Sequence, residues 1–156
     1  MRLVATVPLA LALAACYDFH ADVRTLQSTP MPLGTAIYRL VPESPLRGIG
    51  PATELCLRLP ASYKRINPDT NQLDYGRILR PDGGQVSLHV TLIAPDGRVD
   101  TLPVNGFMYD GNQHVCYMKW VTRDLDRRYQ RIDIQATDTL TVTTILWRSE
   151  ERYAWL

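Results

Sequence analysis

Cysteine and histidine are the residues of this chain best suited to metal or thiol chemistry, and there are three of each: Cys16, Cys56, Cys116, His20, His89 and His114. No two histidines have the i, i+4 spacing of a helical zinc site. His114 and Cys116 lie two apart in an expected strand, hence on one face, and with His89 they could bind copper or zinc. We favour the alternative, a polar histidine at a strand end beside a cysteine that serves the fold. We therefore expect no metal and no cofactor.

Other catalytic signals are weak. Oxygen ligands that would suit calcium gather at Asn67, Asp69, Asn71 and Asp74. The acid that closes an EF-hand loop is replaced by Arg80 when counting from Asp69, and asparagine and aspartate are also ordinary turn formers. No nucleophile elbow, phosphate loop or dinucleotide fingerprint occurs, and no carboxylate pair is singled out as acid and base. We expect a protein that is not an enzyme.

Cys16 has a distinct context at the front of the chain. Arg2 precedes an apolar stretch over residues 3–13, which is too short to span a bilayer as a helix, and Leu13-Ala14-Ala15-Cys16 follows. This resembles the lipobox of bacterial lipoprotein precursors, and the resemblance covers residues 1–18 only. It implies removal of a signal peptide over residues 1–15 and attachment of lipid such as palmitate to Cys16. The alternative is an ordinary cleaved signal peptide that leaves Cys16 as a free or disulfide-bonded cysteine.

The same resemblance implies a location. A lipoprotein is anchored to a membrane of the cell envelope and, here, would face the periplasm. Aspartate directly after the lipidated cysteine is the signal for retention at the inner membrane, and Tyr17 stands there instead. The outer membrane is therefore favoured over the inner.

Length and charge limit the remaining chain. Without the leader, 141 residues remain, which suits one domain with a hydrophobic core. The whole chain has 17 lysines and arginines against 16 acidic residues, and loss of Arg2 makes the two equal. This balance lacks the basic excess of a nucleic-acid-binding protein, so we expect no nucleic acid.

Cys56 and Cys116 remain once Cys16 is assigned to lipid. In an oxidising, exported compartment such a pair predicts a disulfide that closes a loop of about 60 residues. The alternative is two buried free thiols packed as small apolar groups.

The chain after residue 32 predicts short strands separated by turns. Residues 85–93 alternate apolar and polar side chains, Ala94-Pro95-Asp96-Gly97 has the composition of a hairpin turn, and residues 99–104 form the returning strand. A second hairpin is expected from residues 131–136 and 140–147, turning at residues 137–139. Further strands are expected at residues 35–41, 53–59 and 115–121, and a loop at residues 42–51.

These patterns predict an all-β fold of about seven strands, an antiparallel β-sandwich of immunoglobulin-like or jelly-roll type, with a small β-barrel as the alternative. The expected organisation is a signal peptide over residues 1–15, a lipidated N-terminus and tether over residues 16–32, and one sandwich domain over residues 33–156. Strand parity sets Cys56 opposite to Leu55 and Leu57, so the disulfide is expected between neighbouring strands on a rim or outer face rather than through the centre of the core.

Three segments supply a candidate interaction surface. Residues 60–84 mix aromatic and cationic groups, residues 123–131 hold four arginines, and the last four residues include two aromatics. The candidate residues are Tyr63, Arg65, Tyr75, Arg77, Arg127, Arg128, Tyr153 and Trp155.

Together these observations favour a lipid-anchored, non-enzymatic accessory or structural subunit that binds another envelope protein. The alternative is a module that binds carbohydrate or another small ligand on aromatics such as Tyr63, Tyr75, Tyr109 and Trp120.

Overall fold

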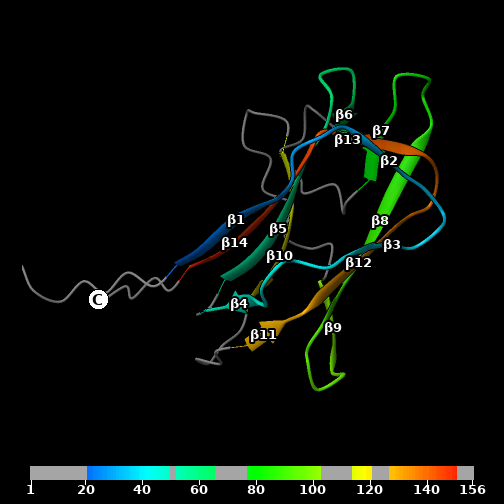
Figure 1. The fold of residues 1–156 in the computed structure, drawn as a ribbon. Coiled ribbons are helices and arrows are strands. Elements are labelled where there is room, and N and C mark those ends of the chain that lie inside the picture. Colours follow the sequence, from blue (N-terminus) through cyan, green and yellow to red (C-terminus); the bar gives the residue numbers. More distant parts are fainter. Residues whose placement is uncertain (1–20, 50–51, 66–76, 103–113, 121–126, 151–156) are drawn as a thin grey trace, which may run out of the picture.

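The computed structural model describes residues 21–49, 52–65, 77–102, 114–120 and 127–150, and in this part of the chain every regular element is a strand (Figure 1). The strands are β1 Ala21–Gln27, β2 Met31–Leu33, β3 Tyr38–Leu40, β4 Leu46–Gly48, β5 Ala52–Arg58, β6 Lys64–Arg65, β7 Arg77–Leu79, β8 Gln85–Ile93, β9 Val99–Leu102, β10 His114–Trp120, β11 Arg127–Tyr129, β12 Arg131–Ala136, β13 Leu140–Val142 and β14 Thr144–Glu150. All of their pairings are antiparallel, as the sequence predicted.

Two larger sheets and two short ribbons make up the fold. One sheet has the order β1-β14-β5-β10, and the other has the order β3-β12-β8-β7-β6 with β9 also paired to β8. The ribbons are β4 with β11 and β2 with β13. None of these sheets closes into a barrel within the described residues, and the architecture is that of a β-sandwich.

The alternation of apolar residues accounts for the strands of the larger sheet. Along β8 the side chains of Val86, Leu88, Val90 and Leu92 are buried, and the residues between them are exposed or half-buried. The predicted turn after β8 is present, because Gly97 donates its N–H to the carbonyl of Ala94 at 3.0 Å. Gly97 has φ 84°, a left-handed conformation that glycine adopts without strain.

The core lies where the two sheets face each other. Buried side chains from β5 and β14, including Leu55, Leu57 and Trp147, join those of β8 and β12 in one hydrophobic cluster. Burial of this apolar surface is the main favourable contribution to folding.

Residues 21–40 and 131–150 form one long antiparallel pairing that crosses from sheet to sheet. β1 pairs with β14, β2 with β13 and β3 with β12, in that order along the chain. The register shifts between Thr25 and Gln27, so the pairing bends before it reaches β2. The structure therefore differs from the expected tether over residues 16–32, because residues 21–27 and 31–33 are strands of the folded body.

The expected second hairpin is wrong. β12 pairs with β3 and β8, whereas β13 pairs with β2 and β14 with β1 and β5. Residues 137–139 thus carry the chain from one sheet toward the other rather than folding a strand back on its neighbour. The expected loop over residues 42–51 contains β4, and the arginine-rich run contains β11.

Among the residues that the structure describes, no helix has the length and apolar character needed to cross a membrane.

Candidate functional site

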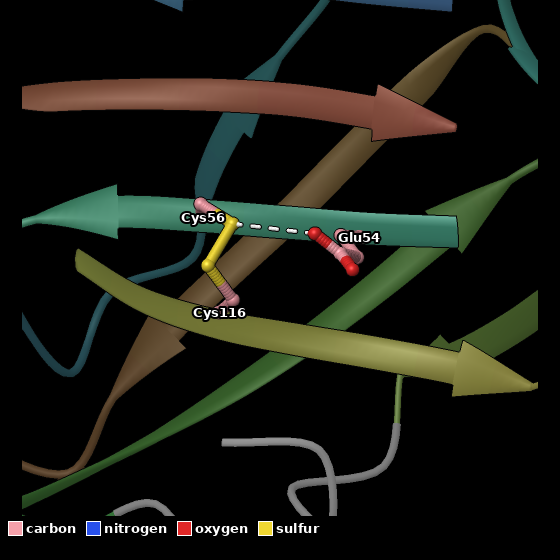
Figure 2. Close-up of side chains that lie close together, drawn as sticks. All are labelled: Glu54, Cys56 and Cys116. Carbon is pink, nitrogen blue, oxygen red and sulfur yellow. Dashed lines mark hydrogen bonds between the residues drawn. A yellow bond between two sulfur atoms is a disulfide. The ribbon is translucent and has the colours of Figure 1, made fainter. Parts of the chain in front are cut away.

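Cys56 and Cys116 form the predicted disulfide between neighbouring strands. They lie directly opposite each other in the pairing of β5 with β10, and their sulfur atoms are 2.02 Å apart (Figure 2). Each cysteine is 7% exposed, so the disulfide is buried. It is buried although Cys56 lies on the opposite face of β5 from Leu55 and Leu57, which face the core. The bond therefore lies within one sheet, as strand parity indicated.

Glu54 lies beside this disulfide. Its carboxylate Oε2 is 4.0 Å from the sulfur of Cys56, and the three side chains have their potential ligand atoms within 4.8 Å of one another (Figure 2). Thiolates are the species that bind metals, and the disulfide removes both of them. In the described part of the chain this is the only cluster of its kind, so His89 and His114 do not join Cys116 in one site.

A second polar cluster surrounds the ring of Tyr129. The hydroxyl of Tyr129 donates to Asp100 Oδ2 at 2.9 Å, and Arg127 Nη1 donates to the same oxygen at 3.1 Å. The ring packs edge-on against Trp147, with centroids 5.9 Å apart. Burial, and then the carboxylate of Asp100, raise the pKa of Tyr129 to about 12. The phenol therefore stays neutral near neutral pH and links β11 to Asp100 of β9 through its hydrogen bond.

Side chains of the four-stranded sheet, from β1 and β14, fix the position of β4 by hydrogen bonds. The N–H of Arg47 donates to Asp22 Oδ2 at 2.7 Å, and the indole N–H of Trp147 donates to the carbonyl of Arg47 at 3.2 Å. Arg24 donates to the other oxygen of Asp22 at 2.6 Å and to both oxygens of Ser44. The start of β1, the connection before β4 and β4 itself are therefore bonded together.

The ribbon of β4 and β11 has two different faces. Leu46 and Gly48 of β4, and Tyr129 of β11, are buried on the inner face. Arg47 and Arg128 occupy the alternate positions and lie directly opposite each other in the register. The outer face of this ribbon thus carries two cationic side chains from strands far apart in sequence.

The structure places the other candidate interaction residues as follows. Tyr63 is half-buried against the core, and its hydroxyl accepts the N–H of Thr141 at 3.2 Å. Arg77 is exposed on β7, and the backbone of Arg65 pairs with Ile78. Outside the described residues, or described only as backbone, are Cys16, Tyr75, Tyr109, Trp120, Tyr153, Trp155 and the expected calcium ligands at 67–74.

The described surface includes the following two hollows. The larger, about 480 Å³, lies along β8 and β12 and is lined by Thr35, Ser87, Leu88, His89, Gln135, Ala136 and Thr137. The smaller, about 290 Å³, is lined by Val41, Pro42, Pro45, Gln130 and Arg131. Neither lining includes a tyrosine or tryptophan, so neither hollow is the stacking platform that the sequence suggested for a sugar-binding module.

Sequence reasoning singled out Arg127 and Arg128 but missed their structural partners. Arg47 lies in a segment rich in proline and glycine, and Asp100 lies in an otherwise ordinary returning strand. Neither position has a local signal, because the pairing of β4 with β11 joins residues about 80 positions apart.

Comparison of the sequence with models of known protein families gave no match. Comparison with curated proteins gave no match either.

Proposed function

We propose that this chain is a lipid-anchored lipoprotein of the cell envelope that acts as a non-enzymatic accessory subunit and binds another envelope protein close to the membrane. The lipid is carried by Cys16, and the folded body faces the periplasm, with the outer membrane favoured over the inner.

One observation carries this proposal. The sequence Leu13-Ala14-Ala15-Cys16 closes an apolar leader, and β1 begins at Ala21, five residues after the cysteine. Five extended residues reach at most about 18 Å. A folded domain joined to its lipid by so short a linker stays next to the bilayer. This position suits a subunit of a membrane-associated assembly better than a protein that must reach partners deep in the periplasm.

An exposed apolar patch offers a contact for the protein partner. Val41 is 71% exposed, and it borders the smaller hollow together with Pro42 and Pro45. Apolar side chains framed by polar residues such as Gln130 and Arg131 are typical of contact surfaces between proteins.

Two measurements in cells test the proposal. Radiolabelled palmitate should label the wild-type product and not a Cys16→Ser variant. A photoreactive amino acid at Val41 should crosslink to an envelope protein, whereas the same residue at Val99, another exposed valine, should give little of that product. Equal palmitate labelling of both chains, or equal crosslinking from both valines, would contradict the proposal.

A second function, binding of a small polar ligand, is favoured by the larger hollow. Hydroxyl, amide and imidazole groups of Thr35, Ser87, His89 and Gln135 line it, and these groups can hydrogen-bond to a sugar. A glycan array separates the two functions. A defined sugar whose binding is lost in a Gln135→Ala variant, together with no crosslink from position 41, would favour this alternative.

A further inference from the structure

The two ends of the described chain leave the folded domain side by side. Ala21, the first residue of β1, lies directly opposite Glu150, the last residue of β14, in the antiparallel pairing of these strands (Figure 1). Cys16 precedes Ala21 by five positions, and Trp155 follows Glu150 by five positions. Five extended residues reach at most about 18 Å from either strand end. The ring of Trp155 can therefore reach the level at which the proposed lipid on Cys16 enters the bilayer.

The residues beyond these paired strand ends are rich in aromatic side chains. Tyr17 and Phe19 precede β1, and Tyr153 and Trp155 follow β14. The whole chain has 3 tryptophans, 8 tyrosines and 2 phenylalanines, so these short flanks hold four of them. Both flanks lie outside the described residues, and the paired strand ends fix where they begin. Tyrosine and tryptophan gather at the surfaces of a bilayer, because their rings are apolar and their O–H or N–H bonds to headgroups or water.

The described side chains at this end of the pairing suit a close approach to a bilayer. Val23 on β1 is an apolar residue that is 62% exposed. Two pairs of charged side chains neutralise each other here. Arg24 donates to Asp22 at 2.6 Å, and Arg148 donates to Glu150 at 2.6 Å. An approaching bilayer therefore meets an apolar side chain and charges that already have partners.

The charges of the flanks exclude a simple attraction to acidic lipids. Residues 17–20 and 151–156 hold two acids, Asp18 and Glu151, against one arginine, Arg152, and His20. Polybasic segments are the ones that bind acidic lipid headgroups by charge, and this composition has no such excess. Burial of aromatic rings is the interaction that these residues offer to a membrane.

We infer that Tyr153 and Trp155 insert their rings into the headgroup region of the bilayer that holds the lipid of Cys16, as a second point of attachment; this inference rests on the proposed lipid anchor. Two aromatic side chains bind a bilayer weakly by themselves. The lipid keeps them within reach of the surface and so raises their effective concentration there. Attachment at two neighbouring strand ends also restricts the tilt of the folded domain, which a lipid on one end leaves free.

The fluorescence of Trp155 in the lipidated protein tests this. The protein is reconstituted into phosphatidylcholine vesicles with or without bromine atoms on the acyl chains near the headgroup, because bromine quenches indole emission only at short range. Subtracting the spectrum of a Trp155→Phe variant from that of the wild type isolates Trp155 from Trp120 and from Trp147, which is buried in the core. The emission of Trp155 should fall about twofold or more in brominated vesicles. Unchanged emission, as expected of a ring packed on the sandwich or left in water, would overturn the inference.

Moving the tryptophan provides matched controls. Val99→Trp with Trp155→Phe keeps the number of tryptophans and places one on β9, at a position where valine is 59% exposed. The emission added at position 99 should be unaffected by brominated lipid. Tyr153→Trp with Trp155→Phe keeps the probe in the flank after β14, and it should be quenched like the wild type. Equal quenching from positions 99 and 155, or no quenching from position 153, would overturn the inference.

Failure of the anchor would look different. A chain without lipid on Cys16 would not float with either type of vesicle in a density gradient, and the proposed function would then fall. A lipidated chain that floats with both types of vesicle while Trp155 stays unquenched would remove only the second point of attachment.

Discussion

At the scale of single residues, the hydroxyl of Tyr129 is the clearest test of how the buried polar cluster stabilises the fold. It donates to Asp100 inside the core, at 2.9 Å. Tyr129→Phe leaves a buried carboxylate with one donor fewer, so we expect the free energy of unfolding in urea to fall by about 1–2 kcal/mol at pH 8. Tyr38→Phe is the control, because Tyr38 is half-buried and its hydroxyl has no hydrogen bond to the described residues. Equal losses in the two variants would contradict a special role for the Asp100 contact.

The same residue predicts a pH dependence. Its pKa is raised from 10.0 to about 12 in the folded protein, so the unfolded chain releases the proton first as pH rises. The stabilisation is present below pH 10 and is lost progressively as the pH rises from 10 to about 12. The difference in stability between wild type and Tyr129→Phe should therefore shrink over this range, and a constant difference would argue against the assigned environment.

The residue scale also shows how far the candidate site could be predicted. The arginine-rich run identified Arg127 and Arg128, but their roles differ: Arg127 pairs with Asp100, and Arg128 points outward. Composition cannot separate the two, because only the pairing of β11 with β4 decides which side chain faces the core. Tyr63 illustrates the reverse case, since its aromatic character suggested a surface contact and the structure packs it against the core.

At the scale of elements, local alternation decided which strands could be predicted. β8 and β12 have the predicted bounds, because an uninterrupted pattern of alternating apolar residues marks both ends. β1 was missed, since its sequence is mostly polar and it is held by pairing with β14 at the other end of the chain. The prediction of the second hairpin was wrong for the same reason. Proximity in sequence favoured pairing of β12 with β13, whereas both strands pair with strands from residues 21–40.

The packing of β4 against β11 can be tested at Gly48. A Cβ atom at this position would lie 3.1 Å from Tyr129 Cε2 and 3.3 Å from Thr53 Oγ1. Gly48→Ala should therefore destabilise the protein by about 1 kcal/mol, because the buried ring must move. Gly34→Ala is the matched control, with no atom within 4 Å of its added Cβ, and it should be neutral or slightly stabilising. Urea unfolding measures both, and a neutral Gly48→Ala would contradict the tight approach of the ribbon.

The Cys56–Cys116 disulfide between β5 and β10 should contribute to the stability of the folded protein mainly by restricting the unfolded chain. It closes a loop across 60 positions, which corresponds to about 4 kcal/mol in the chain-entropy account. We expect a reducing agent to lower the free energy of unfolding of the wild type by about 2–4 kcal/mol. A variant with Cys56→Ala and Cys116→Ala should start at the lower value and should not respond to the reducing agent. An equal response of both proteins would mean that reduction acts elsewhere.

At the scale of the whole molecule, the position of β1 links the fold to the proposed function. The strand nearest to the proposed lipid anchor is also the strand whose ladder with β14 joins the two ends of the described chain. This strand is the edge strand of its sheet, and β14 joins it to β5. Under the proposed lipidation of Cys16, only residues 16–20 separate the lipid from β1, so we expect this segment to limit the height of the folded domain above the membrane.

The corresponding prediction concerns a longer linker between Cys16 and β1. Ten glycine and serine residues inserted between Phe19 and His20 raise the maximum reach from about 18 Å to about 54 Å, and they lower the effective concentration of the body at a membrane-bound partner. Palmitate labelling should be unchanged, whereas the crosslink from position 41 should fall several-fold. The same insertion in the exposed turn between Asp96 and Gly97 keeps the linker at its natural length, so its crosslink should persist. Full crosslinking from the variant with the lengthened linker would show that the partner lies beyond the membrane surface. The short natural linker would then have no part in recognition.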